Sequence, residues 1–133
     1  MYLVDSNVWI ERLLEQEHSE DVRLFLDATP SEQLCITDFS FHSIGLILWK
    51  LNQMRALSDF VKDAFIDGAV LFIHLEPEDT QRIIQVMQEF QIDFDDAYQY
   101  VAAEKYSLTI VSFDSDFDRT ERRRKSPIEV VKG

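Results

Sequence analysis

The sequence has very few residues of the kinds that interrupt or cross-link a chain. Its 133 residues include one cysteine, three glycines and three prolines. A single cysteine excludes an intrachain disulfide, and the apolar neighbours of Cys35 predict a small buried core residue. No low-complexity stretch, repeat or linker is visible. We therefore predict a single domain over residues 1–133.

Long apolar runs are also missing. The apolar runs, such as Ala69–Leu75 and Leu108–Val111, are far shorter than the roughly 20 residues that cross a bilayer. The first residues, Met1–Asp5, lack the basic start, long apolar stretch and cleavage site of a secretory signal. We therefore expect a cytoplasmic protein without a membrane span.

Basic residues are outnumbered, 13 against 25 acidic ones, and the net charge of −12 opposes non-specific attraction to phosphate backbones. Composition alone therefore does not predict a nuclease. Surface acids that keep the protein soluble explain most of this charge, although a carboxylate cluster around a cation would contribute several negative charges. The one dense basic run spans Arg119–Lys125 and contains Arg119, Arg122, Arg123, Arg124 and Lys125. It is expected either to contact phosphate or an acidic partner segment, or to form a solvated loop.

Short β-like apolar runs alternate with longer helical patterns, which predicts an α/β fold with a parallel sheet and crossover helices. Five strands are expected, at Tyr2–Val4, Leu34–Thr37, Ala69–Leu75, Leu108–Ser112 and Ile128–Val131. The helices are expected at about Asn7–Gln16, Ser19–Ala28, Phe39–Gln53, Leu57–Ile66, Glu78–Phe90 and Asp95–Tyr106. Asp38 is predicted to cap its helix, and Pro77 suits the first turn of the next.

Acidic residues follow two of the predicted strands. Asp5 comes directly after the first strand and Asp114 lies two residues beyond the fourth, at the sheet edge where ligands bind in open α/β proteins. Asp96 begins a helix, and Asp116 follows Asp114 closely. Converging carboxylates repel one another, whereas Mg²⁺ or Mn²⁺ binds such hard oxygen ligands. The pattern therefore predicts a metal site.

Simpler roles exist for each of these acids. Asp5 could serve merely as the N-cap of the first helix. Asp96 could merely interact favourably with the positive end of its own helix dipole. Asp114 and Asp116 could be turn residues, because aspartate is common in turns. The set as a whole favours the metal site over these separate explanations.

Three segments in order resemble the PIN domain family. They are Leu3–Asn7 (LVDSN), Asp96–Ala103 (DAYQYVAA) and Ile110–Phe117 (IVSFDSDF). The family begins with an apolar strand that ends in aspartate and a hydroxyl residue. It continues with an Asp-Ala helix start and an apolar strand followed by Thr-x-Asp-x-Asp-Phe. Here Ser112 replaces the threonine. The resemblance spans nearly the whole chain.

The resemblance implies a PIN-like parallel sheet in the order 3-2-1-4-5 with helices on both faces, which would bring Asp5 and Asp114 together. It also implies Mg²⁺- or Mn²⁺-dependent hydrolysis of RNA phosphodiester bonds, as in VapC-type toxins of toxin–antitoxin pairs. Such toxins are commonly homodimers held inactive by a cognate antitoxin. On this basis Asp5, Asp96 and Asp114 are expected to bind the metal, with Asp116 as a looser catalytic member.

The resemblance is incomplete at the helix after the second strand. The family usually carries a glutamate one turn into this helix, and an ungapped reading places Ser43 there, beside His42. His42 and Asp38 are candidates to compensate, although an isolated histidine in a helix is more often structural. The site could then bind one metal ion or two. Ser6, Asn7 and Ser112 could hold water or phosphate, or act as ordinary cap and turn residues.

Four functions are compatible with these residues to different degrees. A metal-dependent endoribonuclease toxin is favoured by the ordered aspartates. A PIN-fold binding or regulatory module with weak or lost nuclease activity is favoured by Ser43. A phosphoryl-accepting receiver domain needs an acceptor aspartate and a late lysine, and Leu75, Glu76 and Lys132 supply no such pair. A haloacid-dehalogenase phosphatase needs Asp-x-Asp after the first strand, where Asn7 stands instead.

Overall fold

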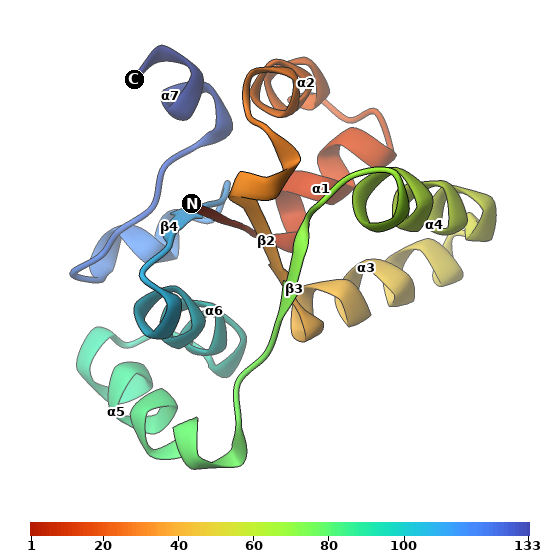
Figure 1. The fold of residues 1–133 in the computed structure, drawn as a ribbon. Helices are drawn as coiled ribbons and strands as arrows, with labels where there is room; N and C mark the ends of the chain where they lie inside the picture. Colours follow the sequence, from red (N-terminus) through yellow and green to blue (C-terminus); the bar gives the residue numbers. More distant parts are fainter.

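The computed structural model describes residues 1–133 as helices packed on a small parallel sheet (Figure 1). Its strands are β1 (Tyr2–Val4), β2 (Leu34–Thr37), β3 (Leu71–Ile73) and β4 (Thr109–Val111). Its α-helices are α1 (Ser6–Leu13), α2 (Ser19–Ala28), α3 (Asp38–Lys50), α4 (Met54–Val61), α5 (Thr80–Phe90), α6 (Phe94–Tyr106) and α7 (Pro127–Lys132). Shorter turns of helix are η1 (Ser31–Gln33), η2 (Lys62–Ile66), η3 (Pro77–Asp79) and η4 (Ser115–Arg119).

The strand order is β3-β2-β1-β4, and all three pairings are parallel. Successive strands run outward from β1 to β3, and the chain then returns to place β4 on the other side of β1. Leu3 pairs with Ile110, and Val4 pairs with Val111. The carboxyl ends of β1 and β4 therefore lie side by side, as the predicted order requires. This reversal point is where α/β sheets form a crevice for ligands.

The fifth predicted strand is wrong, because Ile128–Val131 lies within α7. The Ser126 hydroxyl accepts a hydrogen bond from the Glu129 backbone, and the Glu129 carboxylate accepts one from the Ser126 backbone. This capping box and Pro127 at the first helical position favour a helix over an extended segment. Beside β4 the chain forms only one bridge, between Val111 and Lys125. The predicted order thus holds for the first four strands.

Other boundaries differ by small amounts. The edge strand β3 is shorter than its apolar run, and Leu71 and Phe72 on it are about half exposed. The predicted cap at Asp38 is one residue too late. Thr37 caps α3 instead, because it has extended backbone angles and its Oγ1 accepts from the Ser40 amide at 3.0 Å. Pro77 opens η3, which leads into α5.

Alternate residues of the strands supply two cores, one on each face of the sheet. Leu3, Cys35 and Ile110 pack with α5 and α6, while Val4, Ile36 and Val111 pack with α1 to α4. Helices consequently cover both faces, as predicted, and Cys35 is buried. None of the helices combines the length and the apolar composition that a bilayer span requires.

Candidate metal centre

Backbone geometry places the acidic residues at the carboxyl edge of the sheet. Asp5 follows β1 and caps α1, where its carboxylate accepts from the Ser6 amide at 2.9 Å. Asp114 follows β4 and caps η4, accepting from the Asp116 amide at 2.9 Å. Asp96 lies in the first turn of α6, and its own amide is held by the capping carboxylate of Asp93 at 2.9 Å. The cap and turn roles considered from sequence are therefore real, and they orient the site.

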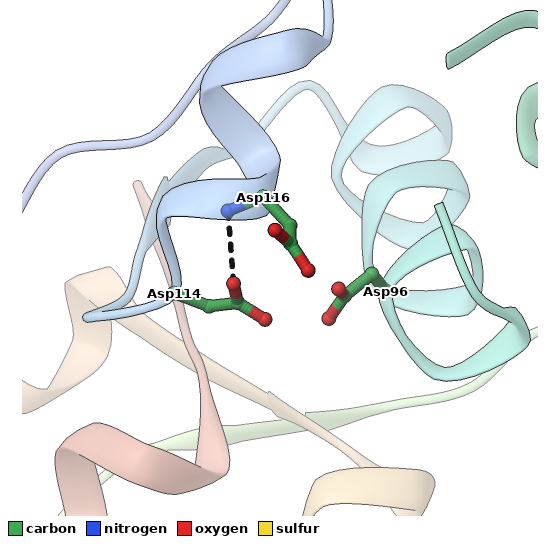
Figure 2. Close-up of side chains that lie close together, drawn as sticks. All are labelled: Asp96, Asp114 and Asp116. Carbon is green, nitrogen blue, oxygen red and sulfur yellow. Dashed lines mark hydrogen bonds between the residues drawn. The ribbon is translucent and has the colours of Figure 1, made fainter. Parts of the chain in front are cut away.

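Three of these carboxylates form a close group. Asp96, Asp114 and Asp116 each offer an oxygen, and the three oxygens lie within 4.8 Å of one another. Figure 2 shows Asp96 reaching from α6 toward the other two side chains, which come from η4 and the loop before it. Asp96 is only 8% exposed. Hard oxygen atoms gathered in this way suit Mg²⁺ or Mn²⁺, and the group contains no sulfur or imidazole ligand.

The electrostatics of the group oppose three free negative charges. Burial, followed by the charge of Asp114, raises the pKa of Asp96 to about 8. Burial also raises the pKa of Asp5, although hydrogen bonds from Ser112, Ser6 and Gln99 act in the opposite direction. At neutral pH the buried Asp96 therefore favours a proton or a cation beside it. Cation binding must displace that proton.

Asp5 lies beside this close group but outside it. Its Oδ1 accepts from the Ser6 amide and from Gln99 at 3.1 Å, and its Oδ2 accepts from the Ser112 hydroxyl at 2.8 Å. Its charge still contributes to the raised pKa of Asp96. Of the expected trio, the structure thus groups Asp96 and Asp114 closely. Asp116, expected as the looser member, stands with them.

Asn7 and Ser112 connect the ends of the two central strands. The Asn7 amide donates to the Ser112 hydroxyl at 3.1 Å, and its oxygen accepts from the Phe113 backbone at 3.2 Å. Ser112 also accepts from the Asp114 backbone at 3.0 Å. These side chains therefore brace the loop that carries Asp114, and their polar atoms have partners within the protein.

The sequence matches the PIN domain family over residues 2–123. The chain belongs to the PIN domain family.

Solved structures of other proteins share the fold of this PIN domain. A toxin–antitoxin complex from Klebsiella pneumoniae has a TM-score of 0.72 at 20% identity, covering 96% of this chain and 98% of that one. FitAcB from Neisseria gonorrhoeae has a TM-score of 0.75 at 22% identity, covering 96% and 98%. VapC20 from Mycobacterium tuberculosis, described as a sarcin–ricin loop cleaving toxin, has a TM-score of 0.74 at 15% identity, covering 89% and 93%. No curated protein matches the sequence.

The departure from the usual PIN pattern is visible at α3. The close carboxylate group contains no residue from this helix. Ser43 is half-buried and His42 is exposed. The Asp38 carboxylate accepts from the Tyr98 hydroxyl at 2.7 Å and from the Phe39 amide at 2.8 Å. Neither His42 nor Asp38 therefore joins the group in place of the missing glutamate.

The basic run of this PIN domain is divided between structural and free cations. Arg122 donates to the Leu108 carbonyl at 3.2 Å, and Arg124 donates to the Ser112 carbonyl at 3.1 Å. Arg119 pairs with the Asp116 carboxylate at 3.0 Å, beside the close group. No ion pair holds Arg123 or Lys125, both of which are exposed.

Sequence reasoning missed one residue of the site, Gln99. It is 1% exposed and hydrogen-bonds to Asp5 from the middle of α6. The available signal was its spacing, three residues after Asp96 on the same face of a helix that is otherwise apolar or small there. An amide at such a position is a buried polar group that needs partners.

Proposed function

We propose that this PIN domain is a Mg²⁺- or Mn²⁺-dependent endoribonuclease that hydrolyses RNA phosphodiester bonds. The observation that carries the proposal is the close group of Asp96, Asp114 and Asp116 at the carboxyl edge of the sheet. Its oxygen-only donors and the raised pKa of Asp96 suit a hard divalent cation. When bound, such an ion supplies an activated water and stabilises charge on phosphate oxygens.

The chain's own residues have separable tasks in this proposal. Asp96, Asp114 and Asp116 hold the ion. Asp5 lies beside them, and its hydrogen-bond donors fix the orientation of its carboxylate. Asn7 and Ser112 keep the Asp114 loop against β1. Because the chain is strongly acidic, the exposed cations Arg123 and Lys125 of the basic run assist the approach of phosphate.

We further propose that the chain is the toxin of a type II toxin–antitoxin module and acts in the cytoplasm with a cognate antitoxin. Support comes from its structural neighbours, which include a toxin–antitoxin complex from Klebsiella pneumoniae and FitAB bound to DNA.

A homodimer is proposed as well. Large apolar side chains are exposed at the end of α3 and the start of α4, namely Leu46, Ile47, Trp49, Leu51 and Met54. Exposed apolar groups gathered in this way favour protein contact.

One observation favours a second candidate, a PIN-fold binding or regulatory module with weak or lost nuclease activity. The carboxylate group receives no acidic side chain from α3, where Ser43 stands at the usual glutamate position. Fewer anionic ligands weaken cation binding, and a single ion cannot stabilise both the attacking and the leaving oxygen as a pair can. The two candidates share a fold and differ in turnover.

A cleavage assay with matched variants separates them. Purified protein is incubated with single-stranded RNA, structured RNA and DNA in Mn²⁺ or in EDTA. Asp96→Asn removes a buried carboxyl group from the site, whereas Asp95→Asn makes the same substitution at the exposed neighbouring position. Cleavage of RNA that needs Mn²⁺, survives Asp95→Asn and falls at least about a hundredfold in Asp96→Asn supports the nuclease. Cleavage unaffected by Asp96→Asn refutes it, and RNA binding without cleavage favours the second candidate.

A further inference from the structure

Gln99 lies beneath the carboxylate site and connects elements that are distant in the chain. It follows Asp96 by three residues on α6, so both side chains leave the same face of the helix. Gln99 is 1% exposed, and its partners Thr37 and Ser40 are fully buried. A buried amide costs free energy unless its donors and acceptor are all used.

Every polar atom of the Gln99 side chain has a partner. Its Nε2 donates to Asp5 Oδ1 at 3.1 Å and to Ser40 Oγ at 2.8 Å. Its Oε1 accepts from Thr37 Oγ1 at 2.7 Å. One side chain on α6 therefore contacts the residue after β1, the last residue of β2 and the first turn of α3.

We propose that Gln99 is a positioning residue of the carboxylate site, which orients Asp5 and connects it to α3 through the hydrogen bonds of its amide. This inference rests on the proposed metal-dependent function. It gives α3 a connection to the site that does not require an acidic residue from that helix. Gln99 acts through Asp5 and makes no hydrogen bond to the close group of Asp96, Asp114 and Asp116.

The contacts at this position use both the N–H donors and the oxygen acceptor of the Gln99 amide. Methionine has a similar length but no donor, so Gln99→Met leaves Asp5 Oδ1 with one donor fewer and deprives the Ser40 and Thr37 hydroxyls of their partner. Ser40→Ala is a milder test. It removes one acceptor of the Gln99 amide but keeps the backbone amide that the Thr37 cap uses.

The test measures Mn²⁺ affinity by calorimetry in protein shown to be folded by circular dichroism. We expect Gln99→Met to weaken Mn²⁺ binding by about tenfold, because it removes a donor that orients the Asp5 carboxylate beside the ion-binding group. Ser40→Ala should weaken it in the same direction by less. The matched control is Val86→Ala on α5, which shortens a fully buried apolar side chain that takes no part in these hydrogen bonds. It should lower stability and leave the dissociation constant unchanged.

A folded Gln99→Met protein whose Mn²⁺ affinity equals that of wild type would overturn the proposal, because Gln99 would then be only structural. A second measurement remains decisive if the wild type binds no metal and the proposed function fails. Urea unfolding midpoints of Gln99→Met, Asp5→Asn and the double variant are compared without metal. If the midpoint shift of the double variant differs from the sum of the two single shifts, Gln99 and Asp5 are coupled, as the proposal requires. If it equals that sum, the connection is rejected.

Discussion

The hydroxyl of Ser112 donates to the Asp5 carboxylate at 2.8 Å, although the two residues are 107 positions apart in the chain. The same oxygen accepts from the Asp114 backbone at 3.0 Å and from the Asn7 side chain at 3.1 Å. One buried hydroxyl thus joins the carboxyl ends of β1 and β4 and connects Asp5 with the loop that carries Asp114.

Removal of this hydroxyl should affect stability and metal binding together. Ser112→Ala removes a donor from the buried Asp5 carboxylate and an acceptor from the part-buried Asp114 amide, so we expect a decrease of about 1–3 kcal/mol in the free energy of unfolding. Mn²⁺ affinity should fall by roughly tenfold, since an orienting group is removed. Urea unfolding and calorimetry measure the two effects, with the exposed Ser115→Ala as control. Wild-type stability in Ser112→Ala would contradict the role of this hydroxyl.

The raised pKa of Asp96 predicts how stability depends on pH. The unfolded carboxyl has a pKa of about 3.9, whereas burial and the charge of Asp114 raise it to about 8 in the fold. Between these values the folded state binds more protons, so metal-free protein should lose stability as pH rises from about 4 to about 8. Asp96→Asn should remove this loss and be more stable than wild type at pH 8.

The expected gain in Asp96→Asn at pH 8 is at least about 1.4 kcal/mol, the equivalent of one pKa unit. Urea unfolding in EDTA across this pH range measures it, with Asp95→Asn as the exposed control. A wild-type protein that becomes more stable than Asp96→Asn as the pH rises would show that Asp96 ionises readily. In the same range, Mn²⁺ should bind wild type more tightly as the pH increases, because binding releases the proton.

Substitutions in the basic run should distinguish the cations that stabilise the fold from those that bind RNA. Arg124→Gln should lower the free energy of unfolding by about 1–3 kcal/mol, because the guanidinium holds the Ser112 carbonyl and pairs with Asp118 at 3.2 Å. Arg123→Gln with Lys125→Gln should leave stability unchanged and weaken RNA binding. The salt dependence of binding should then flatten by about 0.7 in log–log slope for each phosphate that the protein no longer neutralises. An unchanged slope would assign both residues to a solvated loop.

Because Ser43 is half-buried, we expect that replacing it with glutamate will increase the affinity for metal. Ser43→Glu should add an anionic ligand to the group and tighten Mg²⁺ or Mn²⁺ binding by about tenfold. RNA cleavage should rise as well, and both gains should depend on Asp5. Calorimetry and cleavage assays on Ser43→Glu, with and without Asp5→Asn, measure this. No gain in a folded variant would mean that Ser43 does not face the site.

Local patterns predicted most of the fold, and the ends of the first two strands coincided with a change in residue type. Tyr2–Val4 and Leu34–Thr37 have the predicted bounds. The run Ile128–Val131 was misread because its β-branched residues suggest a strand, whereas the preceding Ser126 and the internal Glu129 form the capping box that starts a helix. The edge strand β3 is limited to Leu71–Ile73, the residues that pair with β2, and periodicity does not report the extent of this pairing.

The candidate site was less accessible to sequence reasoning than the fold. The aspartates were recognisable from their positions after strands and at a helix start, but the direction of each carboxylate depends on tertiary hydrogen bonds. Four donor groups draw the Asp5 oxygens toward the interior, while Asp116 turns toward Asp96 and Asp114. Gln99 was missed because its spacing after Asp96 indicates only a shared helix face and does not identify Asp5 as the partner of its amide.

The location of a bound Mn²⁺ ion would show whether the Asp96, Asp114 and Asp116 carboxylates form the metal site. Crystals of the wild type and of Asp96→Asn would be soaked in Mn²⁺, and the anomalous scattering of manganese would locate the ion. We predict a peak in contact with the Asp96, Asp114 and Asp116 carboxylates in the wild type, at oxygen–metal distances of about 2.0–2.6 Å. The peak should be absent or much weaker in Asp96→Asn. An ion bound elsewhere, or one with equal occupancy in both proteins, would show that this carboxylate group is not the metal site.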